Sequence, residues 1–194
     1  MAGFASLGGA GAYIGRVHDD VFGTVFQHDM AAIGVTFRTP ATRGGEPTGR
    51  CLVLVTPDAQ RTMCTYLGTA TALNADDIDP DLVQSAAVTY LEGYLFDPPE
   101  AKKAFVRAAE LAHAAGRKVA ITLSDSFCVD RHRDEFRALV EAHIDILFAN
   151  EDEICALYQV KNFNDAMQAV RGHCDIACLT RSEKGSVILS GDAV

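Results

Sequence analysis

Short apolar runs alternate with helical patterns along the second half of the chain. Residues 119–123, 144–148 and 176–180 are apolar runs of the length expected for buried strands. Between them, apolar residues recur at helical spacing, as over residues 131–143. Strands and helices in such short alternation predict right-handed βαβ crossovers and a mostly parallel sheet.

The same patterns predict the remaining elements. Further strands are expected at residues 10–17, 35–38, 50–56, 61–67, 87–91 and 186–189, and a turn into another hairpin strand at residues 190–194. Further helices are expected at residues 19–33, 79–85, 97–116, 150–158 and 164–172, and residues 1–7 look like the end of one more. Asp19 or Asp20 is expected to cap the first of these helices, and Asp97 the third.

Residues 50–56 and 61–67 are joined by Pro57-Asp58-Ala59-Gln60, which predicts a β-hairpin. The second run alternates polar and apolar residues, so one of its faces is expected to meet water. A half-exposed hairpin within an α/β chain can serve as a lid over a site. Arg61 is the cation of this hairpin best placed to contribute, and an ordinary solvent-exposed arginine at a strand end is an equal alternative.

The stretch 144–153 joins an apolar run to a polar cluster. The run stops at Asn150, and three acids follow at once. Ligands of open α/β sheets sit at the carboxyl ends of strands, so these side chains could organise a metal-phosphate group there. The spacing of Asn150 and Glu153 also matches a capping box, which opens many helices that bind nothing.

Composition narrows the class of protein. The 194 residues are 48% hydrophobic and 22% charged, values typical of globular proteins, and suffice for one α/β domain. A net charge of −9 argues against non-specific binding of nucleic acid. No apolar segment approaches the roughly 18 residues of a membrane span. The phosphate-binding P-loop and the Rossmann fingerprint are both absent from the sequence.

Six cysteines occur without a CxxC pair, which favours reduced thiols in a cytoplasm. Four of them lie among apolar neighbours and are expected to be buried: Cys51, Cys128, Cys155 and Cys178. The sequence therefore predicts a cytoplasmic protein without disulfides.

Six motifs occur in a fixed order. They are Ser6-Leu-Gly-Gly with Ile14-Gly-Arg-Val-His-Asp-Asp-Val-Phe-Gly23, Leu54-Val-Thr-Pro-Asp-Ala-Gln-Arg-Thr62, Glu92-Gly-Tyr-Leu-Phe, Leu123-Ser-Asp-Ser-Phe, Asn150-Glu-Asp-Glu153 and Thr180-Arg-Ser-Glu-Lys-Gly-Ser186. In this order they resemble the motifs of the ribokinase-like (PfkB) family of carbohydrate and nucleoside kinases, and its adenosine-kinase-like branch most closely. In the first motif, Gly15, Asp20 and Gly23 match fixed positions of that family.

The resemblance implies a fold and a reaction. The fold is a three-layer α/β/α domain with a mostly parallel central sheet, incomplete over residues 1–194, with the elements of a small β-hairpin lid at about residues 35–67. The reaction is transfer of a phosphoryl group from ATP, with Mg²⁺, to a hydroxymethyl group of an adenosine-like nucleoside or a sugar. A sugar kinase of the fructokinase or ribokinase type is the alternative within the family.

The resemblance also assigns roles to residues. Asn150 and Glu153 would order Mg²⁺ and phosphate, and Arg61 would close over the transferring phosphate from the lid. The residues expected to contact the nucleotide are Thr180, Arg181, Ser182 and Gly185, and those expected to form an apolar wall for the substrate are Tyr94, Leu95 and Phe96. Ser182 stands where a glycine is common in the family, and a glycine there allows close approach of the backbone.

Two family segments have no counterpart in these 194 residues. They are a Gly-Gly…Asn segment that holds the substrate hydroxyls and a Gly-Ala-Gly-Asp segment that supplies the general base and the anion hole. We therefore expect a fragment that is inactive alone. The alternative from a different class is a non-catalytic module that uses the lid hairpin to form a homodimer or to bind a partner.

Overall fold

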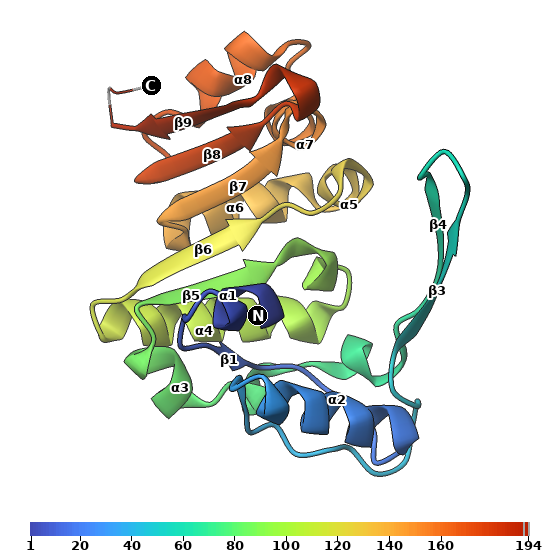
Figure 1. The fold of residues 1–194 in the computed structure, drawn as a ribbon. Coiled ribbons are helices and arrows are strands. Elements are labelled where there is room, and N and C mark those ends of the chain that lie inside the picture. Colours follow the sequence, from blue (N-terminus) through green and yellow to red (C-terminus); the bar gives the residue numbers. More distant parts are fainter. Residues whose placement is uncertain (192, 194) are drawn as a thin grey trace. The chain divides into compact units, whose positions relative to one another are not determined.

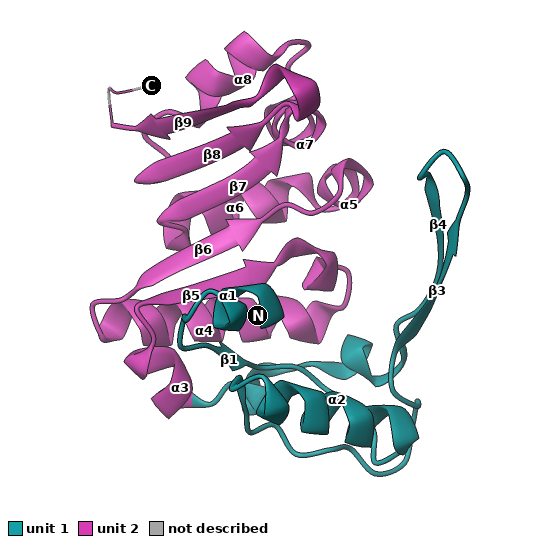
Figure 2. Ribbon diagram, in the orientation of Figure 1, with its two compact units in different colours: residues 1–79 teal, residues 80–194 magenta. Residues whose placement is uncertain are grey.

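The computed structural model describes residues 1–191 and 193. The chain divides into two compact units, Met1–Asp79 and Pro80–Val194 (Figure 2). Among the described residues, no helix is both long enough and apolar enough to cross a membrane. The expectation of a single domain over residues 1–194 stays a prediction.

The second unit is built on a five-stranded sheet. Its strands follow the order of the chain: β5 (Val88–Glu92), β6 (Lys118–Thr122), β7 (Ile146–Asn150), β8 (Ile176–Thr180) and β9 (Ser186–Ser190) (Figure 1). Strands β5 to β8 are parallel, and β9 runs antiparallel to β8. The predicted mostly parallel sheet is confirmed.

The helices of this unit connect its strands. They are α3 (Pro80–Ser85), α4 (Pro99–Ala114), α5 (Ser126–Arg131), α6 (Arg133–His143), α7 (Glu151–Tyr158) and α8 (Phe163–Val170), with short 3₁₀ turns η3 (Gly93–Phe96) and η4 (Ser182–Lys184). Helices α4 and α6 lie behind the sheet in Figure 1, as right-handed crossovers require. The sheet residues that face this layer are buried: Leu91, Val119, Ile121, Leu147, Ala149, Ala177, Leu179 and Leu189.

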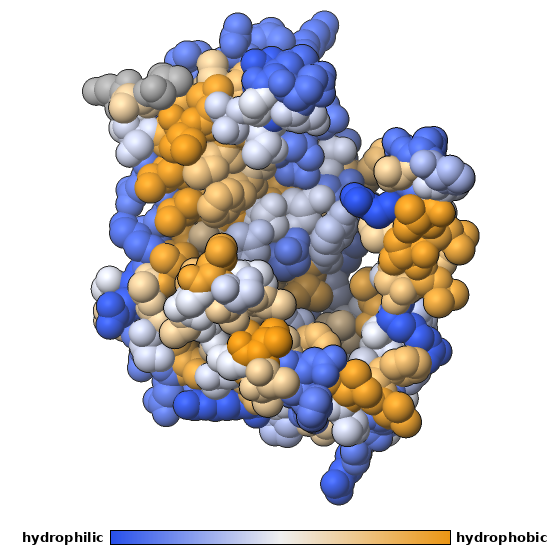
Figure 3. Space-filling view, viewed as in Figure 1, coloured by the Kyte–Doolittle hydropathy of each residue, from blue (hydrophilic) through white to orange (hydrophobic). Residues whose placement is uncertain are grey.

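Among the described residues of this unit, no helix covers the other face of the sheet, which we call its open face. Alternate residues of the same strands point there and stay exposed, among them Val88 (45%), Tyr90 (55%), Phe148 (37%) and Ile188 (57%). Figure 3 shows apolar side chains as an orange band over these strands. Within this unit, the structure therefore contains two layers of the expected three.

The first unit contains a small parallel pair, one longer helix and a hairpin. Its elements are α1 (Ala2–Ser6), β1 (Ala12–Tyr13), α2 (Val21–Ala32), β2 (Thr36–Phe37), β3 (Arg50–Val55), β4 (Arg61–Tyr66), and the 3₁₀ turns η1 (Gly68–Ala72) and η2 (Ala75–Asp77). The rings of Tyr13, Phe26 and Phe37 pack together with centroids 5.5–5.6 Å apart. They hold α2 against the β1–β2 pair.

The predicted hairpin is present, but its exposure was predicted wrongly. Strands β3 and β4 pair antiparallel from Arg50 opposite Tyr66 to Val55 opposite Arg61. Every residue of both strands is exposed, so both faces meet solvent, and Cys51 is exposed with them. A strand's alternation gives it a buried face only where another element covers that face, and neither face of this hairpin is buried. The thiol of Cys128 is buried as expected, those of Cys155 and Cys178 are half-buried, and all six cysteines are free.

Three helix or strand boundaries were also predicted wrongly. The helix expected over 131–143 is α6 and begins two residues later, at Arg133, because the shorter helix α5, which was not among the predicted elements, ends at Arg131. Pro98, not Asp97, is the N-cap of α4, because the Asp97 carboxylate accepts hydrogen bonds from Arg131 and His132 instead. Strand β7 begins two residues later than expected, since Asp145 accepts a hydrogen bond from the backbone N–H of Val119 at the strand's start. The turn predicted over 190–194 lies partly outside the described residues.

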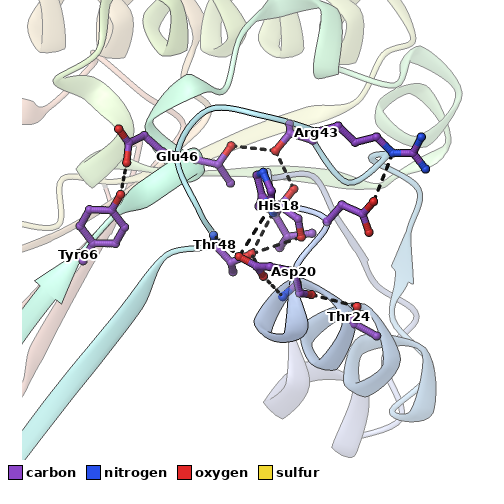
Figure 4. A network of polar contacts seen from close by, with 12 residues as sticks. His18, Asp20, Thr24, Arg43, Glu46, Thr48 and Tyr66 are labelled. Atoms are coloured by element: carbon purple, nitrogen blue, oxygen red, sulfur yellow. Dashed lines mark hydrogen bonds and ion pairs between the residues drawn. The ribbon is translucent and has the colours of Figure 1, made fainter.

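Asp20 is the polar centre of the first unit (Figure 4). Its carboxylate caps α2 by accepting from the N–H of Gly23 at 2.8 Å, and it also accepts from the N–H of Thr48 at 2.9 Å and from the Thr48 hydroxyl at 2.7 Å. Gly23 must be glycine, because a Cβ there would lie 1.9 Å from the carbonyl oxygen of His18. Asp20, rather than Asp19, is therefore the cap, and it ties α2 to a loop 28 residues away.

These bonds predict how stability depends on pH. Donation from the Thr48 and Gly23 N–H groups lowers the pKa of Asp20 to about 2. A lowered carboxyl pKa contributes stability above the pKa of the unfolded chain, and that contribution disappears as the pH falls through the folded pKa. We expect the stability difference between wild type and Asp20→Asn, measured by urea unfolding, to shrink between about pH 4 and pH 2.

Asp19→Asn is the matched control, because the Asp19 carboxylate forms an ion pair with the exposed Arg43, at 3.2 Å, and with no other side chain among the described residues. We expect its stability difference from wild type to be small at every pH. A difference between Asp20→Asn and wild type that does not change with pH would contradict the role given to the Asp20 carboxylate.

Candidate active site

The carboxyl ends of β7 and β8 bring two predicted groups of site residues together. Asn150 and Thr180 are the last residues of these neighbouring strands and are register partners. Helix α7 begins directly after Asn150, and the turn η4 follows Thr180. A cavity of about 220 Å³ lies between them, lined by Asn150, Glu151, Asp152, Thr180, Arg181, Ser182, Glu183 and Lys184.

Asn150 and Glu153 form a complete capping box. The Asn150 side-chain oxygen accepts from the N–H of Glu153 at 2.9 Å. The Glu153 carboxylate accepts from the N–H of Asn150 at 2.9 Å and from its side-chain amide at 2.7 Å. The capping interpretation is thus confirmed, and it leaves the Mg²⁺ role of this pair untested.

Glu153 is buried, with 5% of its surface exposed. Burial raises the pKa of its carboxyl above the ordinary value, and the nearby carboxylates of Asp125 and Asp152 raise it further. The hydrogen bond from the N–H of Asn150 acts in the opposite direction. A buried carboxylate among other acids is a group whose charge a nearby cation would stabilise.

The donor set suits a metal held mainly through water and phosphate. Among the described residues, no three His, Cys, Asp or Glu side chains are grouped so that they could hold a metal ion. Each Glu153 oxygen accepts one hydrogen bond here, and a carboxylate oxygen can accept a second, for example from a metal-bound water. Mg²⁺ usually keeps several waters and binds through one or two carboxylates and substrate phosphates, so these residues fit it.

The predicted nucleotide loop keeps a left-handed backbone at two positions. Ser182 has φ 50° and Gly185 has φ 86°. Serine thus adopts at 182 the conformation that a glycine would adopt more easily, at a cost of roughly 1 kcal/mol. The Arg181 guanidinium lies 4.2 Å above the Phe163 ring and pairs with Glu151. Glu151 and Lys184 also line this cavity, and neither was predicted individually as a site residue, although both lie within the quoted motifs.

The three residues predicted to form the substrate wall differ in how far their side chains are exposed. Tyr94 is 54% exposed and Leu95 is half-buried. Phe96 is 3% exposed and stacks on Phe136 with centroids 4.1 Å apart, so it belongs to the hydrophobic core. On the open face of the sheet, Tyr90 and Phe148 form an aromatic pair that the sequence did not single out.

Neither Arg61, the predicted cation of the lid, nor Asp125, in the motif Leu123-Ser-Asp-Ser-Phe, is among the residues that line the cavity. Arg61 belongs to the first unit, at the start of β4 opposite Val55, where its side chain is exposed. Asp125 accepts from the N–H of Phe127 at 3.0 Å and is the N-cap of α5.

The chain is similar to known kinases over nearly its whole length. A family model described as pfkB family carbohydrate kinase matches residues 1–194. The solved adenosine kinase from Sinorhizobium meliloti is 48% identical with a TM-score of 0.93, covering 98% of this chain and 59% of that chain. A solved probable sugar kinase from Rhizobium etli CFN 42 is 47% identical with a TM-score of 0.93, covering 98% of this chain and 58% of that chain.

The curated relatives match a shorter stretch. The guanosine-inosine kinase of Escherichia coli (strain K12) is 31% identical over 114 residues, which are 57% of this chain and 26% of that protein. The chain thus spans about three fifths of the length of the two solved structures and about a quarter of this curated relative.

Two asparagine caps allow a matched test of the capping box. Asn162 caps α8 as Asn150 caps α7, with its side chain bonded to the N–H of Asp165 at 3.0 Å and to the Asp165 carboxylate at 2.8 Å. Each asparagine→alanine variant should lower the free energy of unfolding by about 0.5–2 kcal/mol. The loss should be larger for Asn150→Ala, because the buried Glu153 carboxylate loses a donor, whereas Asp165 is exposed.

Urea unfolding of both variants measures the difference. If Asn150→Ala costs no more than Asn162→Ala, the amide of Asn150 contributes nothing beyond capping.

Proposed function

Because the chain belongs to the pfkB family of carbohydrate kinases, we propose that it serves ATP- and Mg²⁺-dependent phosphoryl transfer to a hydroxymethyl group of an adenosine-like nucleoside. Membership of the family, together with the TM-score of 0.93, confirms the predicted resemblance and the α/β fold of ribokinase-like kinases. One observation supports the proposal: the β7–β8 register brings Asn150, the first residue of the capping box, and Thr180, Arg181 and Ser182 of the loop to one cavity.

The residues divide the work of positioning and charge neutralisation, on which phosphoryl transfer mainly depends. Asn150 and Glu153 would hold waters of the Mg²⁺ shell, and bound Mg²⁺ would neutralise phosphate charge. Thr180, Arg181, Ser182 and Gly185 would contact the nucleotide. Arg61 would supply a positive charge from the hairpin.

Aromatic side chains favour a nucleoside over a sugar as acceptor. Tyr94 is exposed beside the carboxyl end of β5, and Tyr90 and Phe148 form a pair with centroids 6.1 Å apart on the open face of the sheet. Ring faces of this kind stack with purine bases. Tyr94 and Leu95 are therefore the residues proposed for the substrate wall. A fructokinase- or ribokinase-type sugar kinase is the alternative.

Calorimetric titration of the purified chain with ATP and Mg²⁺ tests the proposal, since every proposed nucleotide contact lies within these residues. We expect saturable binding that requires Mg²⁺. Phosphorylation assays with adenosine, guanosine, inosine, ribose and fructose then address the acceptor. Absence of nucleotide binding by a folded chain would contradict the proposal, and turnover would contradict the expectation that these residues are inactive alone.

Glu153→Gln separates the Mg²⁺ role from capping. Changes in residues that orient a metal shell typically cost about 10–100-fold in metal affinity or activity, so the Mg²⁺ concentration needed for ATP binding should rise by that factor. Stability should change by only about 1 kcal/mol, because glutamine retains one of the two hydrogen bonds to Asn150.

Asp165→Asn is the control, since Asp165 occupies the same position in the Asn162 cap of α8. It should leave the Mg²⁺ requirement unchanged. If Glu153→Gln lowers the free energy of unfolding by clearly more than about 1 kcal/mol while the folded variant has the same Mg²⁺ requirement as wild type, Glu153 is a capping residue only.

The hairpin supports a second proposal, a homodimer formed through β3 and β4. Large apolar side chains on it are exposed: Leu52 (70%), Leu54 (61%), Val55 (65%) and Met63 (64%). Figure 3 shows an orange, apolar surface along the hairpin. Exposed apolar surface of this density is a recognised feature of interaction sites.

Sedimentation equilibrium of the chain should show a dimer that the double change Leu52→Ser and Leu54→Ser converts to monomer. Both side chains lie outside the core, so the fold should persist. Phe127→Ser, which removes another exposed apolar side chain (73%) from α5, should leave the dimer intact. A monomeric wild-type chain would contradict this proposal.

A further inference from the structure

We propose that Glu151 holds the place of a phosphate group in the cavity between α7 and η4, and that nucleotide binding displaces it from Arg181 and Lys184. The inference rests on the proposed nucleotide role of this loop. It adds two residues to that role: Lys184 as a further phosphate contact and Glu151 as an internal competitor.

Two cations converge on one oxygen of Glu151. Oε2 lies 3.2 Å from Nε of Arg181 and 3.6 Å from Nζ of Lys184. The other oxygen, Oε1, accepts from Nη2 of Arg181 at 3.3 Å. Two positive groups on one carboxylate oxygen mark a point in the cavity where a single anionic oxygen is stabilised.

The side chain of Arg181 is held in place by a contact that does not involve Glu151. The Arg181 guanidinium rests on the Phe163 ring at 4.2 Å, so it keeps its position when its partner leaves. Glu151 is the first residue of α7, and the hydrogen bonds of the Asn150–Glu153 box hold that helix without it. The Glu151 side chain can therefore rotate away while α7 stays in place.

The charged residues that line the cavity explain how Glu151 affects the affinity for phosphate. Besides Arg181 and Lys184, three residues with carboxylate side chains line the cavity: Glu151, Asp152 and Glu183. The Arg181 guanidinium lowers the pKa of the Glu151 carboxyl, so Glu151 stays ionised at neutral pH. An incoming phosphate group must replace a paired carboxylate rather than meet two free cations, and its affinity is lower for that reason.

Phosphate is the ligand chemistry that fits the released cations. A guanidinium presents two parallel N–H donors, which match two oxygens of one phosphate, and an ammonium adds a mobile point charge. The carboxylate of Glu151 occupies the guanidinium in the same two-bond manner.

Glu151→Gln tests the inference, with Glu183→Gln as control. Glu183 lines the same cavity and carries the same charge, but no ion pair joins it to Arg181 or Lys184 among the described residues. Titrations use two probes at low ionic strength: inorganic tripolyphosphate, and ATP with Mg²⁺. Thermal unfolding verifies that each variant is folded.

We expect Glu151→Gln to tighten tripolyphosphate binding about two- to tenfold, the range expected from losing two partly exposed ion pairs. Glu183→Gln should tighten it less, and the gap between the variants should narrow as salt is added. Equal or weaker binding by Glu151→Gln, or equal effects of the two variants, would overturn the inference.

The two probes separate this inference from the proposed function. If Glu151→Gln tightens tripolyphosphate binding while no variant binds ATP, the placeholder role, in which Glu151 competes with phosphate for Arg181 and Lys184, is supported. The nucleotide role, in which the loop binds ATP, is then overturned. If all variants bind ATP with Mg²⁺ and Glu151→Gln gains nothing with either probe, the nucleotide role stands and the placeholder role fails.

Discussion

The register between β7 and β8 is the constraint on which the rest of the site depends. Leu147 pairs with Ala177 and Ala149 with Leu179, and all four side chains are buried under the helices. A slip of one residue would turn these side chains to the open face, so the hydrophobic core holds the register. The pair Asn150 and Thr180 follows from that register. The core thereby decides which polar residues meet at the sheet edge.

Three successive acids after this strand have three different environments. Glu151 pairs with Arg181 and Lys184, Asp152 is exposed, and Glu153 is buried in the capping box. The helix produces this difference, since successive residues project about 100° apart around its axis. One short sequence motif thus supplies an ion pair with the neighbouring loop, a solvent-exposed charge and a desolvated carboxylate.

The two units expose apolar surface for different reasons. In the second unit, strand alternation sends every other side chain to the face that carries no helix of that unit, as with Tyr90 and Ile188. In the first unit, both faces of the β3–β4 hairpin are exposed because nothing of that unit packs on them. The exposed face of the sheet follows from its alternation, whereas the hairpin's second face could not be anticipated from its own pattern.

Local rules in the sequence determined the order of the elements, the parallel sheet, the Asp20 and Asn150 caps and the hairpin, because each depends on residues a few positions apart. Only the tertiary structure decided the separate helix α5 before α6, the burial of Phe96 on Phe136, and the partner of Asp97. Only the tertiary structure could show that Glu151 forms an ion pair with Arg181, 30 residues further along the chain. These outcomes depend on which side chains, distant in the sequence, the fold brings into contact with a given group. No short-range sequence pattern encodes those contacts.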